Sequence, residues 1–307
     1  MRDRTPEWVS PEILASFDAE GTDAHRVCSS VGGWAERFGR DFLVSWRDAA
    51  FRDAMRAGLG AWAKGAGLAL DRIFERELPR RAEARSSPTL FQGDAAMPAE
   101  GVATERGMRF LIDFAGGYSV GLFPDQRGNR ALVRQWRPAK TLNLFAYTCS
   151  FSVAAALGGG HATSVDLSRK SLERGRGNFS ANGLDPGAHA FIAADALRLL
   201  PRMERRDERY DCVIVDPPTF SRGEGGRAFR VERDMADLAL AALRLVGTRG
   251  RLLLATNCGT MDEADLRAAA RYALKATRRG ADMHAEPPPP DVPPEEAAKT
   301  LWILAKD

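Results

Sequence analysis

The residues from Thr141 to Asp166 constrain the fold more than any other part of this 307-residue chain. Thr141–Ala146 is a short apolar run, typical of a strand buried on both faces. After a turn of small residues, Phe151–Leu157 predicts an alanine-rich helix that three glycines end. Ala162–Val165 then predicts a second strand, which leads directly to Asp166. Such a strand–turn–helix–strand unit, closing on a carboxylate, is typical of the nucleoside-binding half of a doubly wound fold, where the acid accepts hydrogen bonds from ribose hydroxyls.

The turn of this unit indicates which nucleoside would bind. A dinucleotide site has G-x-G-x-x-G there, so that a helix N-terminus meets the pyrophosphate. The turn here is Tyr147-Thr148-Cys149-Ser150, without glycine, which argues against NAD and FAD. S-adenosylmethionine (SAM) has no phosphate and carries a positive sulfonium, so close backbone approach and carboxylates suit it. Asp166 alternatively caps the next helix, but Ser168 already provides a cap there.

Composition sets broad limits on the protein. A length of 307 residues suggests about two domains. The sequence has no run of about 18 apolar residues and no apolar signal core at its start, so we expect a cytoplasmic protein without a membrane partner. The four cysteines show no metal-binding spacing and predict no metal site, and a net charge of +3 permits nucleic acid binding without requiring it.

Residues 1–104 predict a small α+β domain that is a candidate for substrate or RNA binding. We expect helices over Pro11–Phe17 and Ala49–Lys64, and strands over Phe42–Trp46 and Leu68–Phe74. A charged loop carries arginines that are able to contact phosphate, although a solvated charge run is the commoner explanation: Arg80, Arg81 and Arg85.

Residues 105–137 are predicted to bridge to a second domain. Met108–Phe114 and Tyr118–Phe123 alternate apolar and polar residues around Gly116-Gly117, which predicts a hairpin. The stretch Gly121–Arg130 that follows is dense in polar side chains, and a helix is then expected to end at Trp136.

Residues 138–307 predict a parallel α/β sheet. Strands and helices alternate in the order βαβαβαβαβαββ, with a hairpin at the end. Ligands in such sheets bind outside the C-terminal ends of the strands. Asp166, Asp195, Asp216 and Cys258 all fall at those ends. The fold class we expect is therefore α/β with a Rossmann-like sheet and a smaller N-terminal α+β domain.

Two of these strand ends suggest further roles. Asp216-Pro217-Pro218-Thr219-Phe220 follows a buried strand, and its prolines fix a rigid turn that holds a carboxylate and a carbonyl beside the cofactor. Phe220 offers a face on which a flat base can stack; the alternative is a strand-ending turn with a packed phenylalanine. Asp195 can accept a hydrogen bond from an adenine amino group, or it can cap the helix that begins at Ala196.

Four stretches resemble SAM-dependent methyltransferases that modify large-subunit ribosomal RNA, a family that includes 5-methylcytosine and 7-methylguanosine enzymes. They are LNLFAYTCSFSVAAALGGG, SVDLSRKSLERGRGNFSANGL, YDCVIVDPPTFSR and, upstream of these, GYSVGLFPDQRGNR, which is similar to the family's Gly-Leu-Phe-x-Asp-Gln-Arg stretch. The resemblance extends from about Glu105 to Met261. It implies SAM as cofactor, ribosomal RNA as partner and a seven-stranded class I methyltransferase sheet over residues 138–307. Cys149-Ser150 stands where the family usually has Gly-Gly, and the family's RNA-binding PUA module is expected to be absent.

The resemblance also implies the site residues. It places Asp166 on the ribose, Asp195 on the adenine and the turn from Tyr147 to Phe151 along the methionine part. The cofactor-binding set it implies is Gln126, Arg127, Phe145, Tyr147, Thr148, Cys149, Ser150, Phe151, Asp166, Leu167, Ser168, Asp195, Ala196 and Asp216. The catalytic set it implies is Asp216, Pro217, Phe220 and Cys258.

Cys258 decides between two chemistries. Cytosine C5 becomes nucleophilic only after a thiolate adds at C6, whereas a ring nitrogen or amino group has a usable lone pair. Cys258 lies just past a strand end, about where the 5-methylcytosine members keep their nucleophile, although those members usually read Ser-Cys-Ser-Gly. It is alternatively a small buried thiol. In that case Asp216 and the Pro217 carbonyl would orient an amino group or a guanine ring.

The sequence leaves other functions open. One alternative is a methyltransferase for proteins or small molecules, and another is a non-catalytic SAM-binding protein, against which the retained Asp216–Phe220 stretch argues. The sequence leaves the oligomeric state open, a homodimer included.

Overall fold

The computed structural model describes residues 5–79, 85–222 and 228–307, which form two compact units. The first unit comprises Met1–Pro124 with Pro289–Pro293, and the second comprises Asp125–Pro288 with Pro294–Asp307. The boundary between these units lies after Pro124, within the segment 105–137 that the sequence analysis describes as a bridge between two domains. Arg80 and Arg81 lie outside the described residues.

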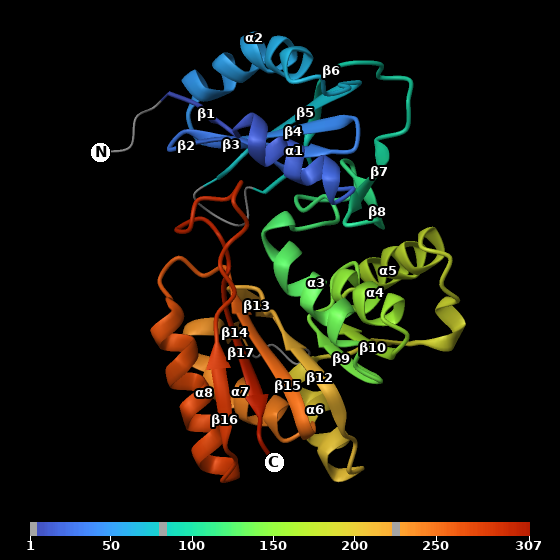
Figure 1. Cartoon of the computed structure of the whole chain (residues 1–307), viewed down its shortest axis with the longest axis vertical. Helices are drawn as coiled ribbons and strands as arrows, with labels where there is room; N and C mark the ends of the chain where they lie inside the picture. Colours follow the sequence, from blue (N-terminus) through green and yellow to red (C-terminus); the bar gives the residue numbers. More distant parts are fainter. Residues whose placement is uncertain (1–4, 80–84, 223–227) are drawn as a thin grey trace. The chain divides into compact units, whose positions relative to one another are not determined.

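The first unit is built on a six-stranded sheet in the order β1-β2-β3-β4-β5-β6 (Figure 1). Neighbouring strands are antiparallel except β4 and β5, which are parallel because a helix connects them. In chain order the elements are β1 (Glu7–Trp8), α1 (Pro11–Ala19), β2 (Ala24–Ser30), β3 (Gly33–Phe38), β4 (Asp41–Trp46), α2 (Ala49–Gly65), β5 (Arg72–Glu77), β6 (Thr89–Gln92), β7 (Glu100–Glu105) and β8 (Met108–Asp113).

Helix α2 covers this sheet with the face that the sequence predicted. Asp48 caps its N-terminus by accepting a hydrogen bond from the Ala50 amide. Phe51, Met55 and Leu59 are buried at the helical spacing and pack against sheet residues. The helices and β4 are confirmed, but the strand predicted over Leu68–Phe74 is shifted, since β5 begins only at Arg72.

The hairpin predicted around Gly116-Gly117 is wrong. Strand β8 pairs instead with β7, so that Glu105 faces Met108 across a two-residue turn. Both turn residues, Arg106 and Gly107, have positive φ (48° and 76°), as a tight hairpin requires. Among the described residues, those from Tyr118 to Phe123 form no strand.

The second unit has the strand–helix alternation that the sequence predicts. In chain order its elements are η2 (Pro124–Gln126), α3 (Arg127–Trp136), β9 (Lys140–Leu144), α4 (Ser150–Leu157), β10 (His161–Asp166), α5 (Arg169–Ala181), η3 (Pro186–Ala188), β11 (Ala190–Ala193), α6 (Ala196–Arg205), β12 (Tyr210–Val215), β13 (Phe220–Arg222), β14 (Ala228–Arg230), α7 (Val231–Leu243), β15 (Val246–Thr256), α8 (Glu263–Thr277), β16 (Ala281–His284) and β17 (Lys299–Ala305).

The seven-stranded sheet predicted for this unit is confirmed, in the order β11-β10-β9-β12-β15-β17-β16. Strands β11, β10, β9, β12 and β15 are parallel, and β17 and β16 form the predicted antiparallel end. Leu144 pairs with Val165 on one side and Val215 on the other. Asp166 and Asp216 are the residues after Val165 and Val215. They therefore lie at the same level of the sheet, on either side of the turn that follows β9.

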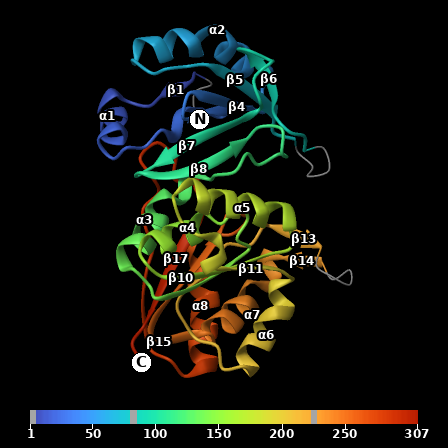
Figure 2. The same ribbon diagram turned by 90° about the vertical axis from the view of Figure 1, so that its right-hand side faces the viewer.

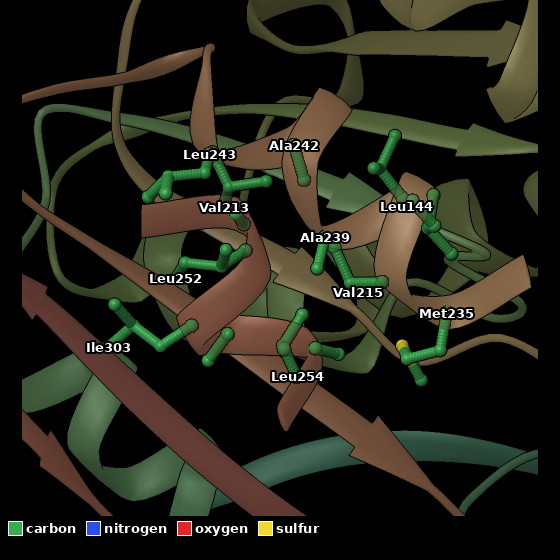
Figure 3. Packing of buried hydrophobic residues seen from close by; sticks show 14 of the residues in the cluster. Leu144, Val213, Val215, Met235, Ala239, Ala242, Leu243, Leu252, Leu254 and Ile303 are labelled. Atoms are coloured by element: carbon green, nitrogen blue, oxygen red, sulfur yellow. The ribbon is translucent and has the colours of Figure 1, made fainter. Parts of the chain in front are cut away.

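The two faces of this sheet carry different helices, with α3, α4 and α5 on one side and α6, α7 and α8 on the other (Figure 2). Alternate strand residues, among them Leu144, Val215 and Leu254, pack with α6–α8 in one large apolar core (Figure 3). The intervening residues face α3–α5, where Asn143 hydrogen-bonds Ser152 of α4. No helix in the described part of the chain has the length and apolarity needed to cross a membrane.

Candidate active site

The turn after β9 holds three residues in an uncommon backbone conformation. Phe145, Tyr147 and Cys149 have φ values of 55°, 47° and 62°, in the left-handed region that favours glycine. Each such residue costs about 1–3 kcal/mol, so the surrounding structure must stabilise the turn. Cys149 adopts this conformation at the position where the resembled family usually has glycine.

Helix α5 supplies much of that support. The buried Asn178 donates from Nδ2 to the carbonyl oxygen of Thr148 over 2.8 Å. One helical turn earlier, Gly175 leaves room for Cys149: a Cβ at Gly175 would overlap the Cys149 Sγ and lie 3.0 Å from its Cβ. Cys149 is fully buried, and this burial raises the pKa of its thiol to about 12, so its side chain packs as a protonated thiol.

Gly175→Ala is therefore expected to displace the turn. It should weaken the binding of S-adenosylhomocysteine, the product form of the expected cofactor, by about tenfold, a loss near 1.4 kcal/mol. Adding Cys149→Gly removes the overlap and should restore most of the affinity, as a double-mutant cycle by calorimetry would record. Gly60→Ala, in α2 with no atom within 4 Å of its added Cβ, is the matched control. Equal affinities for Gly175→Ala and wild type would show that α5 does not hold the turn.

Asp166 is positioned by two backbone amides. Its Oδ2 accepts from the Tyr147 N–H and its Oδ1 from the Ser168 N–H, each over 2.8 Å. Ser168 caps α5, because its Oγ accepts from the Ser171 N–H. Each carboxylate oxygen keeps a further acceptor position, which suits a pair of ribose hydroxyls. The adjoining Leu167 is 41% exposed.

Asp195 serves as a helix cap. Its Oδ1 accepts from the Leu197 N–H over 3.0 Å at the start of α6. The other oxygen remains able to accept from a ligand. Ala196 is only 4% exposed and packs in the apolar core of the unit.

Asp216 and the prolines form the corner after β12. Pro217 is buried, whereas Phe220 is 47% exposed at the start of the β13–β14 hairpin. The Arg230 guanidinium lies 5.7 Å from the Phe220 ring centroid. The corner is anchored at Thr219, whose hydroxyl donates to Asn257 over 3.2 Å. An exposed aromatic ring thus follows a fixed carboxylate by four positions.

The pKa of Asp216 is raised to about 7, first by burial and then by the nearby carboxylate of Asp125, with Arg130 opposing the shift. Asp125 is held in place by the Ala298 N–H, which donates to its Oδ2 over 3.1 Å. Arg130 is 1% exposed and lies 5.8 Å from the Phe151 ring centroid. The carboxyl group of Asp216 therefore belongs to a charged cluster with groups from η2 and α3.

Sequence reasoning named Gln126 and Arg127 but missed Asp125 and Arg130. Gln126 and Arg127 are both buried, at 3% and 2% exposure. Asp125 and Arg130 could have been found from the sequence, because they lie in the same polar stretch, Gly121–Arg130, as Gln126 and Arg127. In an α-helix, positions three and four apart share a face, so Arg130 returns to the side of Gln126.

Cys258 lies past the end of β15 and is 3% exposed. Its Sγ is 3.5 Å from Glu232 Oε1 and 3.1 Å from Thr260 Oγ1. The Thr260 hydroxyl also donates to Glu232 over 2.6 Å, and hydrogen bonds from Thr260 and then Cys258 lower the pKa of this carboxyl. The thiol is thus hydrogen-bonded to an ionised acid of α7.

Three strand ends of this unit thus carry carboxylates. Asp166 is the last residue of β10, whereas Asp195 follows β11 and Asp216 follows β12, and β9 with its turn lies between β10 and β12. This arrangement defines a nucleoside-binding doubly wound α/β unit.

Comparison with known proteins gives the family. The family model for S-adenosylmethionine-dependent methyltransferases matches residues 61–303. The chain belongs to that family. The buried amide of Gln126, which has no protein partner on its nitrogen among the described residues, and the amide-held carboxylate of Asp166 fit a ligand with hydroxyl and carboxylate groups, so the residues present suit SAM.

Two curated proteins and one solved structure are similar to this chain. "Ribosomal RNA large subunit methyltransferase I" of Klebsiella pneumoniae is 34% identical over 165 residues, covering 53% of this chain and 41% of that protein. "Ribosomal RNA large subunit methyltransferase K/L" of a Psychrobacter species is 38% identical over 161 residues, covering 51% and 20%. The chain thus spans less than half the length of these curated relatives. The solved structure titled "Crystal structure of SMU.776, a putative methyltransferase complexed with SAH" shares the fold, with TM-score 0.79, 24% identity and coverage of 97% of this chain and 83% of that one.

Proposed function

We propose that this protein transfers the methyl group of SAM to a base in RNA of the large ribosomal subunit. The observation that carries this proposal is the corner after β12, where the exposed ring of Phe220 follows the half-buried carboxylate of Asp216. A flat base can stack on the ring while its polar edge meets the carboxylate and the Pro217 carbonyl. The two curated relatives, which are both named ribosomal RNA large subunit methyltransferases, support the same substrate, large-subunit ribosomal RNA.

The acceptor that we propose is an amino group or ring nitrogen. Methyl transfer requires the acceptor to approach the sulfonium methyl in line, and the protein contributes position and exclusion of water. SAM supplies an already activated methyl group, so a nitrogen lone pair needs no covalent help. Attack through Cys258 would require its thiol, which is 3% exposed, to leave its contacts with Glu232 and Thr260 and reach the base.

Cys258→Ala is accordingly expected to retain methyl transfer within about threefold of wild type, since the residue serves packing and one weak hydrogen bond. The measurement is the initial rate with labelled SAM. Cys212→Ala, another buried thiol, is the matched control. Complete loss in Cys258→Ala alone, with unchanged thermal stability, would instead establish covalent attack on cytosine C5.

The substrate itself is tested by incubating the protein with labelled SAM and with three separate acceptors: large-subunit RNA, small-subunit RNA and total protein. Label is expected in large-subunit RNA and should fall steeply as salt rises, because phosphate contacts release counterions. Nuclease digestion of the product would then identify the modified base. Label in protein with none in RNA would refute the proposal.

A further inference from the structure

The side chain of Gln126 is almost fully buried, and its amide is only half used. Its Oε1 accepts a hydrogen bond from Asn129 Nδ2 over 2.9 Å. Its Nε2 is buried and has no hydrogen-bond partner among the described residues. A buried amide nitrogen without an acceptor is unfavourable, so it indicates a group that the protein itself does not supply.

The orientation of this amide follows from a neighbouring indole. Trp302 Nε1 can only donate, and it lies 2.7 Å from Asn129 Oδ1. The oxygen of Asn129 must therefore face Trp302, and its nitrogen must face Gln126. Gln126 in turn must present its oxygen to Asn129, which leaves its NH₂ group as the unused donor. The hydrogen bonds thus run from Trp302 of β17 to Asn129 of α3 and from Asn129 to Gln126. The indole N–H fixes which atom of each amide is oxygen and which is nitrogen.

The position of Gln126 connects these hydrogen bonds to the site. It directly follows Asp125 and precedes Arg130 by one helical turn, and both of these side chains act on the carboxyl group of Asp216. Helix α3, which carries Asn129 and Arg130, packs beside α4 at the turn that we assign to the cofactor.

We propose that Trp302 and Asn129 are positioning residues that fix the Gln126 amide, so that its NH₂ donates to an oxygen acceptor on the bound reactants. Two sources carry such an oxygen: the carboxylate of the cofactor's methionine part and the carbonyl of the acceptor base. This inference rests on the proposed function, since it assumes that the site binds SAM beside a base.

The test uses the full chain with S-adenosylhomocysteine in calorimetry and with labelled SAM and RNA in kinetics. Gln126→Leu removes the donor and keeps the volume. Asn129→Asp reverses the polarity, because Gln126 must then donate to the new carboxylate and present its oxygen to the ligand. Trp302→Phe releases Asn129 and leaves its amide free to rotate. Gln135→Leu, the same change at an exposed position of α3, is the control.

We expect Gln126→Leu and Asn129→Asp each to lose about tenfold or more, the size of one hydrogen bond to a charged or polar acceptor. The double variant should lose no more than either single one, since both remove the same contact. Trp302→Phe should show a smaller loss of the same kind. A loss in S-adenosylhomocysteine affinity assigns the oxygen to the cofactor, and a loss only in kcat/KM for RNA assigns it to the base.

The inference is overturned if Gln126→Leu binds and turns over like wild type. It is also overturned if the losses in Gln126→Leu and Asn129→Asp add, because a merely structural role of Asn129 would act independently. Thermal unfolding identifies a variant that fails to fold, and Gln126→Leu with Trp302→Phe then still decides the question. Failure of the wild type to bind S-adenosylhomocysteine would contradict the proposed function instead.

Discussion

Asp216→Asn is expected to lower the rate of methyl transfer at pH 8 by at least about 100-fold, while S-adenosylhomocysteine affinity changes by only a few-fold. The substitution keeps the shape of the side chain but replaces a carboxylate oxygen, which accepts from the base, with an amide. Acid–base contacts of this kind typically contribute about 100- to 10,000-fold. Initial rates with saturating SAM measure the effect, and Asp237→Asn on the exposed face of α7 is the control.

The pH dependence provides a second, independent readout of the same group. With the pKa of Asp216 raised to about 7 by burial, the carboxylate is half protonated near neutrality. The wild-type kcat/KM for SAM, which reports on the enzyme before SAM binds, should therefore rise as pH increases through about 7 and then level off. The sulfonium of bound SAM favours the ionised form, so the apparent pKa in kcat should lie lower.

As pH rises, the free energy of unfolding should fall while the rate of methyl transfer increases. Because the pKa of Asp216 is higher in the folded protein than in the unfolded chain, the folded state binds the extra proton. It therefore loses stability as pH rises from about 4 to about 7, by about 1.4 kcal/mol for each pH unit in that interval. Asp216→Asn has no such loss. Its free energy of unfolding should exceed that of wild type at pH 8 and approach it below pH 4. An unchanged rate and an unchanged stability difference across this range would show that Asp216 is solvated and plays no part.

Asp166→Ala is expected to weaken S-adenosylhomocysteine binding by at least about 100-fold. The carboxylate would make two hydrogen bonds to the ribose, each worth about 1.5–3 kcal/mol for a charged acceptor, and tenfold corresponds to 1.4 kcal/mol. Its removal also frees the Tyr147 amide and so loosens the strained turn. Calorimetry measures the affinity directly.

Asp185→Ala is the matched control for this variant, because Asp185 also accepts from a backbone amide, that of Gly187, but lies outside the site. It should bind like wild type. If Asp166→Ala bound the ligand with undiminished affinity while remaining folded, the assignment of the ribose to the end of β10 would be wrong.

The sequence predicted the second unit well because its central strands are buried along most of their length. The apolar run Val213–Val215, which ends at Asp216, leaves little ambiguity about where its strand stops. The alternation of such strands with helices then determines the sheet by short right-handed connections. This is why the carboxylates of Asp166, Asp195 and Asp216 could be assigned to one edge of the sheet from sequence alone.

The first unit was harder to predict because its strands carry buried polar residues. Strand β2 is buried along its whole length although it contains His25, Arg26 and two serines. The Arg26 guanidinium donates to Ser29 Oγ over 3.3 Å, and the backbone amide of Arg26 donates to Asp291, which lies far away in the sequence. Neither contact is revealed by the alternation of apolar and polar residues. Strands β2 and β3 consequently escaped prediction.

The site shows the same division. Residues directly after a strand were found, whereas Asp125 and Arg130 act on Asp216 from a different element, and their effect depends on how α3 packs on α4. Cys258 illustrates the converse. Its place after β15 suggested a nucleophile, and only its contacts with Glu232 and Thr260 favour a packing role.

A crystal structure of the protein soaked with SAM is the most direct test of the central claim, that acids at neighbouring strand ends hold the cofactor with its methyl group toward the proline corner. The account predicts that both ribose hydroxyls lie within hydrogen-bonding distance of the Asp166 carboxylate and that the methyl carbon points toward Asp216 and Pro217. Electron density for SAM at any other place, or with its ribose away from Asp166, would contradict it.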